Sequence, residues 1–259
     1  MNTIFLAEIK FFYDNYTGED IAGMFSTEHF ISIILFILFG WMILYLTRKF
    51  NKEQVKKLHI VTASIITLLE VIKISLRIYK QQAYDSWVPL YFCSLFIFAV
   101  WVSLSSNKYL SRMGYAYMTM GGIGASICFT LYPSTSFGMY PAWHPSTIYS
   151  FIFHLAMFIT GVLALTKRIY EPKAKDGILY FIFIITACIP SVFINDALQT
   201  NCMFLRHPFQ LPILQQLVDF SPILYIVVMT LFQSVIVFWG CFGIYTFINN
   251  KLSSKGEVK

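Results

Sequence analysis

Long apolar segments dominate this chain, and they restrict it to one kind of solvent. Hydrophobic residues make up 57% of the 259 residues and charged residues only 12%, whereas a soluble domain carries about 25% charged residues. So few charges cannot cover a globule in water, and a helix that crosses a bilayer needs ~20 mostly apolar residues. The sequence therefore predicts an all-α, polytopic membrane helix bundle with no room for a separate soluble catalytic domain.

Seven segments are predicted to cross the membrane, and residues 1–259 are expected to form a single transmembrane helical domain. We expect Ser26 to cap the first span, Pro190 to kink the sixth, and Gly114 and Gly121 to let the fourth approach its neighbours closely. Residues 196–221 are expected to form a loop or a short surface helix. The predicted spans cover about 30–45, 58–78, 87–104, 113–131, 146–165, 177–194 and 222–248.

The lysines and arginines are sorted by side. The connections after predicted spans 1, 3 and 5, together with the C-terminal tail, hold 14 of the 19. The N-terminal segment and the other connections hold 4 when Arg77, at the outer end of span 2, is counted with them, and Lys73 lies within span 2. Because positive residues gather in cytoplasmic loops, the N-terminus is predicted to lie outside and the C-terminus in the cytoplasm. This sorting explains the net charge of +6 without a nucleic-acid-binding domain.

Polar and ionisable side chains within the spans are the candidate functional residues, because a charged group costs roughly 2.5–3.5 kcal/mol to insert into a bilayer core. At ~1.5 Å of rise per residue, Glu70, Cys93 and His154 lie about 9–12 Å below the predicted outer boundary. His29 and Asn195 end their spans on the same side. This common level favours a polar cavity that opens to the outer side.

A cysteine and a histidine at one depth suggest a nucleophile and its base. The histidine would remove the thiol proton, and the thiolate would attack an ester carbonyl, with Glu70 or Asn195 orienting the histidine or stabilising the oxyanion. Structural interpretations stay open for each residue. Cys93 can be an ordinary buried side chain, His154 can form an interhelical hydrogen bond, and Glu70 can pair with Lys73 three residues further on.

Four more residues are predicted to contact a lipid substrate: His29, Tyr91, Arg77 and Asn201. Arg77 lies near the outer end of its span, where it either snorkels or binds a phosphate headgroup. The five cysteines lack the spacing of a metal site, and the sequence contains no phosphate loop, dinucleotide fingerprint or zinc motif. We therefore predict membrane lipids as partners, with no nucleic acid, no metal and no cofactor.

Several short motifs occur in a distinctive order between about residues 25 and 245, and they comprise Phe25–His29, Glu70, Pro89–Leu95, His154 and Asn201–Leu205. Together they resemble the YwaF-like bacterial integral membrane proteins, which are distantly similar to the animal transmembrane-protein-164 acyltransferase family. The resemblance implies a multi-pass protein of the bacterial cytoplasmic membrane. It also implies acyl transfer between phospholipids through a cysteine acyl-enzyme. Tyr91 departs from the bacterial pattern, which usually has histidine there, and Leu90 stands where the animal members have the reactive cysteine.

The leading hypothesis is a phospholipid acyltransferase or lipid hydrolase in which Cys93 is the nucleophile and His154 the general base. The alternative is a transporter or receptor-like binding protein for a small or lipidic solute, for which broken helices and midplane charge are typical. A non-enzymatic membrane scaffold is a third interpretation. The substrate, the oligomeric state and the direction of the reaction are left open.

Overall fold

The computed structural model describes residues 21–79, 88–208 and 212–254. These ranges contain helices, turns and loops and no strand, which confirms the predicted all-α class. Five helices in the described part are long and apolar enough to cross a membrane. They match predicted spans 1, 2, 5, 6 and 7 and comprise Thr27–Lys49, Lys52–Tyr79, Pro145–Thr166, Asp176–Leu198 and Pro222–Ser254. The total of seven spans and their orientation stay predictions.

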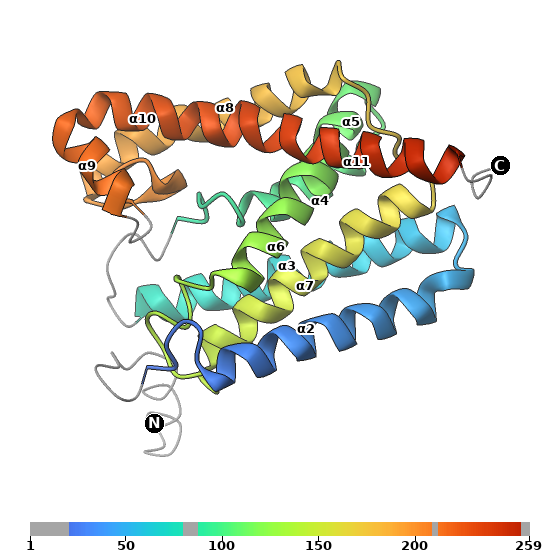
Figure 1. Cartoon of the computed structure of the whole chain (residues 1–259), viewed down its shortest axis with the longest axis horizontal. Coiled ribbons are helices and arrows are strands. Elements are labelled where there is room, and N and C mark those ends of the chain that lie inside the picture. The colour runs from blue at the N-terminus through green and yellow to red at the C-terminus, as the bar shows by residue number, and fades with distance from the viewer. Residues whose placement is uncertain (1–20, 80–87, 209–211, 255–259) are drawn as a thin grey trace. The chain divides into compact units, whose positions relative to one another are not determined.

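Among the connections that the structure describes throughout, residues 132–144 form the longest one without a helix (Figure 1). In chain order they are α2 (Thr27–Leu46), the 3-10 turn η2 (Thr47–Lys49), α3 (Lys52–Tyr79), α4 (Leu95–Ser103), α5 (Lys108–Ala116), the π-helix η4 (Tyr117–Gly122), α6 (Ile123–Leu131), α7 (Pro145–Thr166), α8 (Asp176–Leu198), the 3-10 turn η5 (Cys202–Phe204), α9 (Pro212–Phe220), α10 (Pro222–Leu231), the π-helix η6 (Phe232–Ile236) and α11 (Val237–Ser254).

The helices at predicted spans 3 and 4 differ from the prediction in where they begin and in their helical type. Span 3 is helical only from Leu95, after a turn over residues 91–94, and its predicted first residue, Trp87, lies outside the described residues. Span 4 is one continuous helical run, Lys108–Leu131, whose central turns are the π-helix η4. Residues 1–20 also lie outside the described part. The predicted outward location of the N-terminus therefore stays a prediction.

Local capping signals explain where several helices begin. The Ser26 hydroxyl accepts a hydrogen bond from the His29 backbone N–H (3.2 Å), as predicted. The Asn107 side chain accepts from Tyr109 N (2.9 Å) at the start of α5, and Pro222 occupies the first turn of α10 after the cap Ser221. These caps satisfy N–H groups that have no acceptor within the helix.

The described contacts divide the chain into two compact units, each built from two separate stretches. Unit 1 combines the residues up to Lys49 with Ala125–Ile159, and unit 2 combines Phe50–Gly124 with Thr160–Lys259. In unit 2, α4 and α5 approach so closely that a Cβ atom on Gly114 would meet the backbone of Ser103. The predicted role of glycine in the fourth span is therefore confirmed at this position.

Candidate functional site

Two loops of unit 2 contact each other and carry three of the predicted site residues: Tyr91, Cys93 and Asn201. One is residues 88–94, before α4, and the other is residues 199–208, after α8, which is here called the α8–α9 loop. The Met203 N–H donates to the Leu90 carbonyl (2.7 Å), and the Tyr91 and Phe204 rings lie with their centroids 5.3 Å apart. The structure thus brings the segment of Cys93 and Tyr91 against the segment of Asn201.

Asn195, near the end of α8, holds the start of the α8–α9 loop. Its side-chain oxygen accepts from the Cys202 N–H (2.6 Å) and the Thr200 hydroxyl (2.8 Å), and its amide nitrogen donates to the Cys202 carbonyl (3.0 Å). Asn195 and Cys202 are both buried. These contacts give Asn195 a structural role in the loop, and its predicted orienting or oxyanion role stays a prediction.

The second half of the same loop is fixed by Asn201 and Arg206. The Asn201 side-chain oxygen accepts from the Arg206 N–H (3.0 Å) and the His207 N–H (2.9 Å). The Arg206 guanidinium donates to the Asn195 carbonyl (3.0 Å) and to the Gln199 side-chain oxygen. Asn201 therefore shapes the loop from within, while Arg206 ties the loop back to α8.

The backbone of this loop is strained at three non-glycine residues. Gln199, Met203 and Phe204 have φ values of 55°, 51° and 52°, in the left-handed region that side chains disfavour. Such conformations cost of order 1–3 kcal/mol each and gather at functional sites. The hydrogen bonds of Asn195 and Asn201 hold the loop in this shape.

We expect an Asn195→Ala variant to open the loop, because it removes three hydrogen bonds, each worth about 0.5–1.5 kcal/mol. The thiol of Cys202, which has no exposed surface, should then react with a maleimide roughly tenfold faster or more. Mass spectrometry of labelled peptides measures this rate. The exposed neighbour Asp196, changed to Asn, is the control and should leave Cys202 protected; equal protection in Asn195→Ala would contradict the role assigned to Asn195.

Each of the two π-helices contributes one polar side chain to these loops. The Tyr117 hydroxyl, in η4, donates to the Phe92 carbonyl next to Cys93. The Gln233 amide, in η6, donates to the Met203 carbonyl (2.9 Å). A π-helix shifts the register of the following residues, and such segments are frequent at functional sites. Neither residue was predicted, because π-helices have no simple signature in a hydropathy pattern.

Cys93 lies in the turn that leads into α4, and its side chain is half-buried. The Leu95 and Phe96 N–H groups donate to the Tyr91 (3.2 Å) and Cys93 (3.0 Å) carbonyls, so the turn continues directly into the helix. The first N–H groups of α4 are therefore already hydrogen-bonded within the turn, and the partial positive charge at this end comes from the aligned peptide dipoles of the helix. A thiolate is stabilised at such a place, so the position favours a nucleophilic cysteine.

A cavity of about 390 Å³ lies between α8, the α8–α9 loop and the start of α10. Asn195, Asp196, Arg206 and Tyr225 form its polar lining, and the remaining lining is apolar. The Tyr225 hydroxyl donates to the Phe204 carbonyl (2.8 Å), so the strained loop forms one wall. The cavity therefore combines an apolar surface with a guanidinium and a carboxylate.

The other two predicted site residues of unit 2, Glu70 and Arg77, lie on α3. The Glu70 carboxylate forms an ion pair with Lys73 (2.6 Å), and Glu70 is buried. This confirms the local pairing that the three-residue spacing indicates. Arg77 follows one turn later on α3 and is half-buried, and its role in binding a headgroup stays a prediction.

In unit 1, His29 joins α2 to α6. Its Nδ1 accepts from the Phe25 N–H (3.0 Å), so Nε2 carries the proton and donates to the Thr130 carbonyl (2.9 Å). The ring has no exposed surface. Both nitrogens are used within the protein, which gives His29 a structural role; its predicted contact with substrate stays a prediction.

His154, on α7 in unit 1, has the tautomer that a general base requires. Its Nδ1 contacts the Ser150 carbonyl (2.7 Å), which can only accept, so Nδ1 carries the proton. Its Nε2 is buried and has no hydrogen-bond partner within the described residues. The ring stacks on Phe129 with the centroids 3.7 Å apart. A neutral imidazole with an available Nε2 lone pair can accept a proton.

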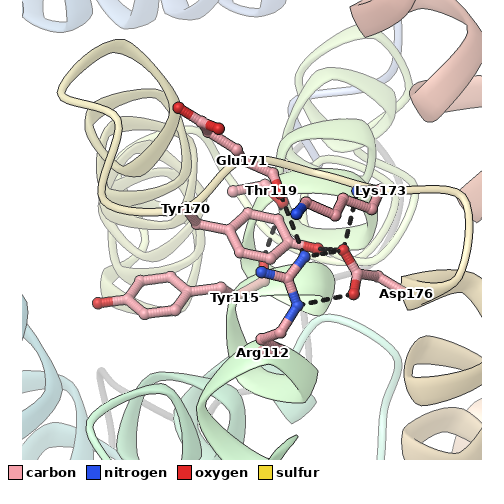
Figure 2. A network of polar contacts seen from close by, with 7 residues as sticks. All are labelled: Arg112, Tyr115, Thr119, Tyr170, Glu171, Lys173 and Asp176. Carbon is pink, nitrogen blue, oxygen red and sulfur yellow. Dashed lines mark hydrogen bonds and ion pairs between the residues drawn. The ribbon is translucent and has the colours of Figure 1, made fainter. Parts of the chain in front are cut away.

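An ion pair between the half-buried Arg112 and the buried Asp176, in another part of unit 2, was not predicted (Figure 2). Asp176, at the start of α8, accepts from Arg112 Nε (2.8 Å) and Nη2, from the Tyr170 hydroxyl (2.9 Å) and from the Lys173 N–H (2.8 Å). All four donors converge on one carboxylate, so the network fastens α5, residues 170–173 and α8 together.

Comparison with known proteins places the chain in a family. The model of the TMEM164 family matches residues 24–250. The chain belongs to the TMEM164 family. No curated protein and no solved structure matches it.

Family membership confirms the coarser part of the resemblance seen in the sequence. It agrees with a multi-pass membrane protein and with the five long apolar helices of the described residues. The matched range includes every predicted site residue, from His29 to Asn201. The narrower YwaF-like assignment and the bacterial cell membrane stay predictions.

Proposed function

We propose that this member of the TMEM164 family is a membrane enzyme that transfers or hydrolyses acyl chains of phospholipids. The observation that carries the proposal is the position of Cys93. It lies at the start of α4, and its segment contacts the strained α8–α9 loop through Leu90 and Met203. That loop is also a wall of the cavity that contains Arg206. A thiol, a strained loop and an amphipathic cavity are thus parts of one unit.

The proposed reaction has two balanced steps. The Cys93 thiol loses its proton to His154 Nε2, and the thiolate attacks the ester carbonyl carbon. The C–O bond breaks, the leaving alcohol takes the proton, and a thioester on Cys93 remains. A hydroxyl of a lysophospholipid, or water, then attacks the thioester carbonyl and passes its proton through His154 Nε2 to the departing Cys93 sulfur. The C–S bond breaks, the thiol is restored, and a new phospholipid ester or a free fatty acid leaves.

Two features support these roles. The dipole of α4 stabilises a thiolate at Cys93, and the half-buried position of Cys93 leaves part of this residue exposed to a substrate. His154 has its proton on Nδ1, so Nε2 is the nitrogen available as a base. Cys93 and His154 belong to different units. The Cys93→Ala and His154→Ala variants described next therefore test whether these two residues act in one reaction.

We expect Cys93→Ala to lower acyl transfer in proteoliposomes by about 100-fold or more, and His154→Ala by ~10²–10⁴-fold. The assay follows a labelled acyl chain from a diacyl phospholipid to a lysophospholipid. Intact-mass spectrometry should detect a hydroxylamine-sensitive acyl adduct on the wild-type protein and not on Cys93→Ala. Thermal unfolding of each variant shows whether it is folded.

The matched control is Cys128→Ala, which removes an exposed thiol of α6. This variant should keep wild-type transfer. Full activity in both Cys93→Ala and His154→Ala would rule out the assignment. Flux of a solute across the vesicles with no covalent change in the lipid would instead favour the transporter interpretation.

A further inference from the structure

Helix α9 (Pro212–Phe220) is joined to a membrane-crossing helix by a single residue. Ser221 separates it from α10, and the Ser221 hydroxyl accepts from the Leu224 N–H (3.3 Å) as the cap of α10. Residues Pro222–Ser254 form one of the five long apolar helical runs. Because α10 starts such a run, α9 lies at the level where that run leaves the membrane, and Figure 1 shows it turned back beside the start of α10.

The length and the faces of α9 fix what it can do there. Its nine residues span about 13 Å at 1.5 Å per residue, less than half of the ~30 Å hydrocarbon core, so the helix cannot cross it. Its polar residues lie on one face, where the Gln215 amide donates to the Asp219 carboxylate (2.8 Å). Leu214, Leu217 and Val218 are half-buried.

Two large apolar side chains of α9 remain exposed along one edge. Ile213 and Phe220 are 73% and 80% exposed, and their spacing of seven residues places them two turns apart on the same stripe. The neighbouring Ile223, at the start of α10, is 76% exposed. An exposed apolar edge beside a polar face is typical of a helix that lies in the membrane interface.

We propose that the Ile213–Phe220 edge of α9 inserts into the headgroup–acyl boundary of the bilayer, with Gln215 and Asp219 facing water. The helix has no lysine or arginine, so insertion of apolar side chains, rather than attraction to anionic lipids, holds it there. The partner of this surface is therefore the lipid bilayer itself, including one made of zwitterionic lipid only.

This placement has a consequence for the cavity beside α10. Pro222, Tyr225 and Ile226 line that cavity, and they follow α9 directly in the chain. Phe193, which also lines it, is 71% exposed. An anchored α9 fixes the mouth of the cavity at the level of the lipid headgroups, so a ligand enters from the bilayer. Insertion of α9 into the bilayer requires no acyl transfer at Cys93.

Photo-crosslinking tests the proposal with the full chain in vesicles of phosphatidylcholine alone. Benzoylphenylalanine replaces, one at a time, Ile213, Phe220, Gln215 or Asp219, all of which are exposed. After irradiation, intact-mass spectrometry should find about tenfold more lipid adduct at positions 213 and 220 than at 215 and 219. The same probe at Ile223, in the membrane-crossing run, shows that the reaction works.

Three results would overturn the inference. One is an equal yield of lipid adduct on both faces of α9. Another is the absence of adduct at positions 213 and 220 when position 223 reacts. The last is a covalent dimer at positions 213 and 220, which would show that a second copy of the chain, rather than lipid, covers this edge.

Discussion

An Arg112→Ala variant is expected to lower the free energy of unfolding by about 3–5 kcal/mol. The substitution removes two charged hydrogen bonds from Asp176, whose side chain is only 1% exposed. The carboxylate would keep the Tyr170 hydroxyl and the Lys173 N–H, but its charge would be buried without a partner. Thermal unfolding in detergent micelles, followed by circular dichroism, measures the loss.

Three further variants show that the loss comes from the pair. Lys108→Ala, at an exposed position of the same helix α5, should change the stability by less than about 0.5 kcal/mol. Arg112→Lys should recover only part of the loss, because an ammonium cannot form the same two-pronged contact. The double variant Arg112→Met with Asp176→Leu should be more stable than Arg112→Ala. A stability of Arg112→Ala equal to that of Lys108→Ala would contradict the structural role of the pair.

Adding one methyl group at Gly114 is expected to have an effect of similar size. A Cβ atom there would overlap the Ala99 carbonyl and the Ser103 backbone in α4. Backbone atoms cannot escape by a change of rotamer, so α4 and α5 must separate. Overpacking of this kind costs typically 1–3 kcal/mol and occasionally more, and we expect Gly114→Ala to lie at or above the upper end, as measured by the same unfolding assay.

Gly240 in α11 provides a control of opposite sign. A Cβ atom at Gly240 would meet nothing within 4 Å, and alanine favours a helix over glycine by ~1 kcal/mol. Gly240→Ala should therefore leave the stability unchanged or raise it slightly, while Gly114→Ala lowers it. If both variants shift stability in the same direction by the same amount, the close approach of α4 and α5 is not what Gly114 provides.

Local patterns predicted much of the fold. Five of the predicted spans are long apolar helices in the described residues, because a bilayer demands unbroken apolar runs. The predicted helix cap at Ser26 and the predicted ion pair between Glu70 and Lys73 were also confirmed, because each depends on residues only three positions apart. Hydropathy could not show that α4 starts only at Leu95, because a turn made of apolar residues scores like a helix.

The candidate site was predicted less well, because its contacts join residues far apart in the chain. Arg112 and Asp176 are 64 positions apart, and each was assigned to a cytoplasmic connection. Tyr117 and Gln233 contact the two loops from π-helices. Asn195 and Asn201 were selected for their polarity within or beside apolar segments, but sequence could not show that both are bonded within one loop. His59, buried in α3 near the Tyr115 ring, was missed.

The two stretches of unit 1 are made at different times, because Phe50–Gly124 of unit 2 lies between them in the chain. The ribosome completes α2 before the ~75 residues of Phe50–Gly124, which take roughly 4–15 s to make at 5–20 residues per second. During that interval the His29 imidazole has no Thr130 carbonyl to bind. Newly made α2 must therefore wait in the translocation machinery or in lipid until Ala125–Ile159, the other stretch of unit 1, has been made, and a chaperone or insertase has its best opportunity to act during this interval.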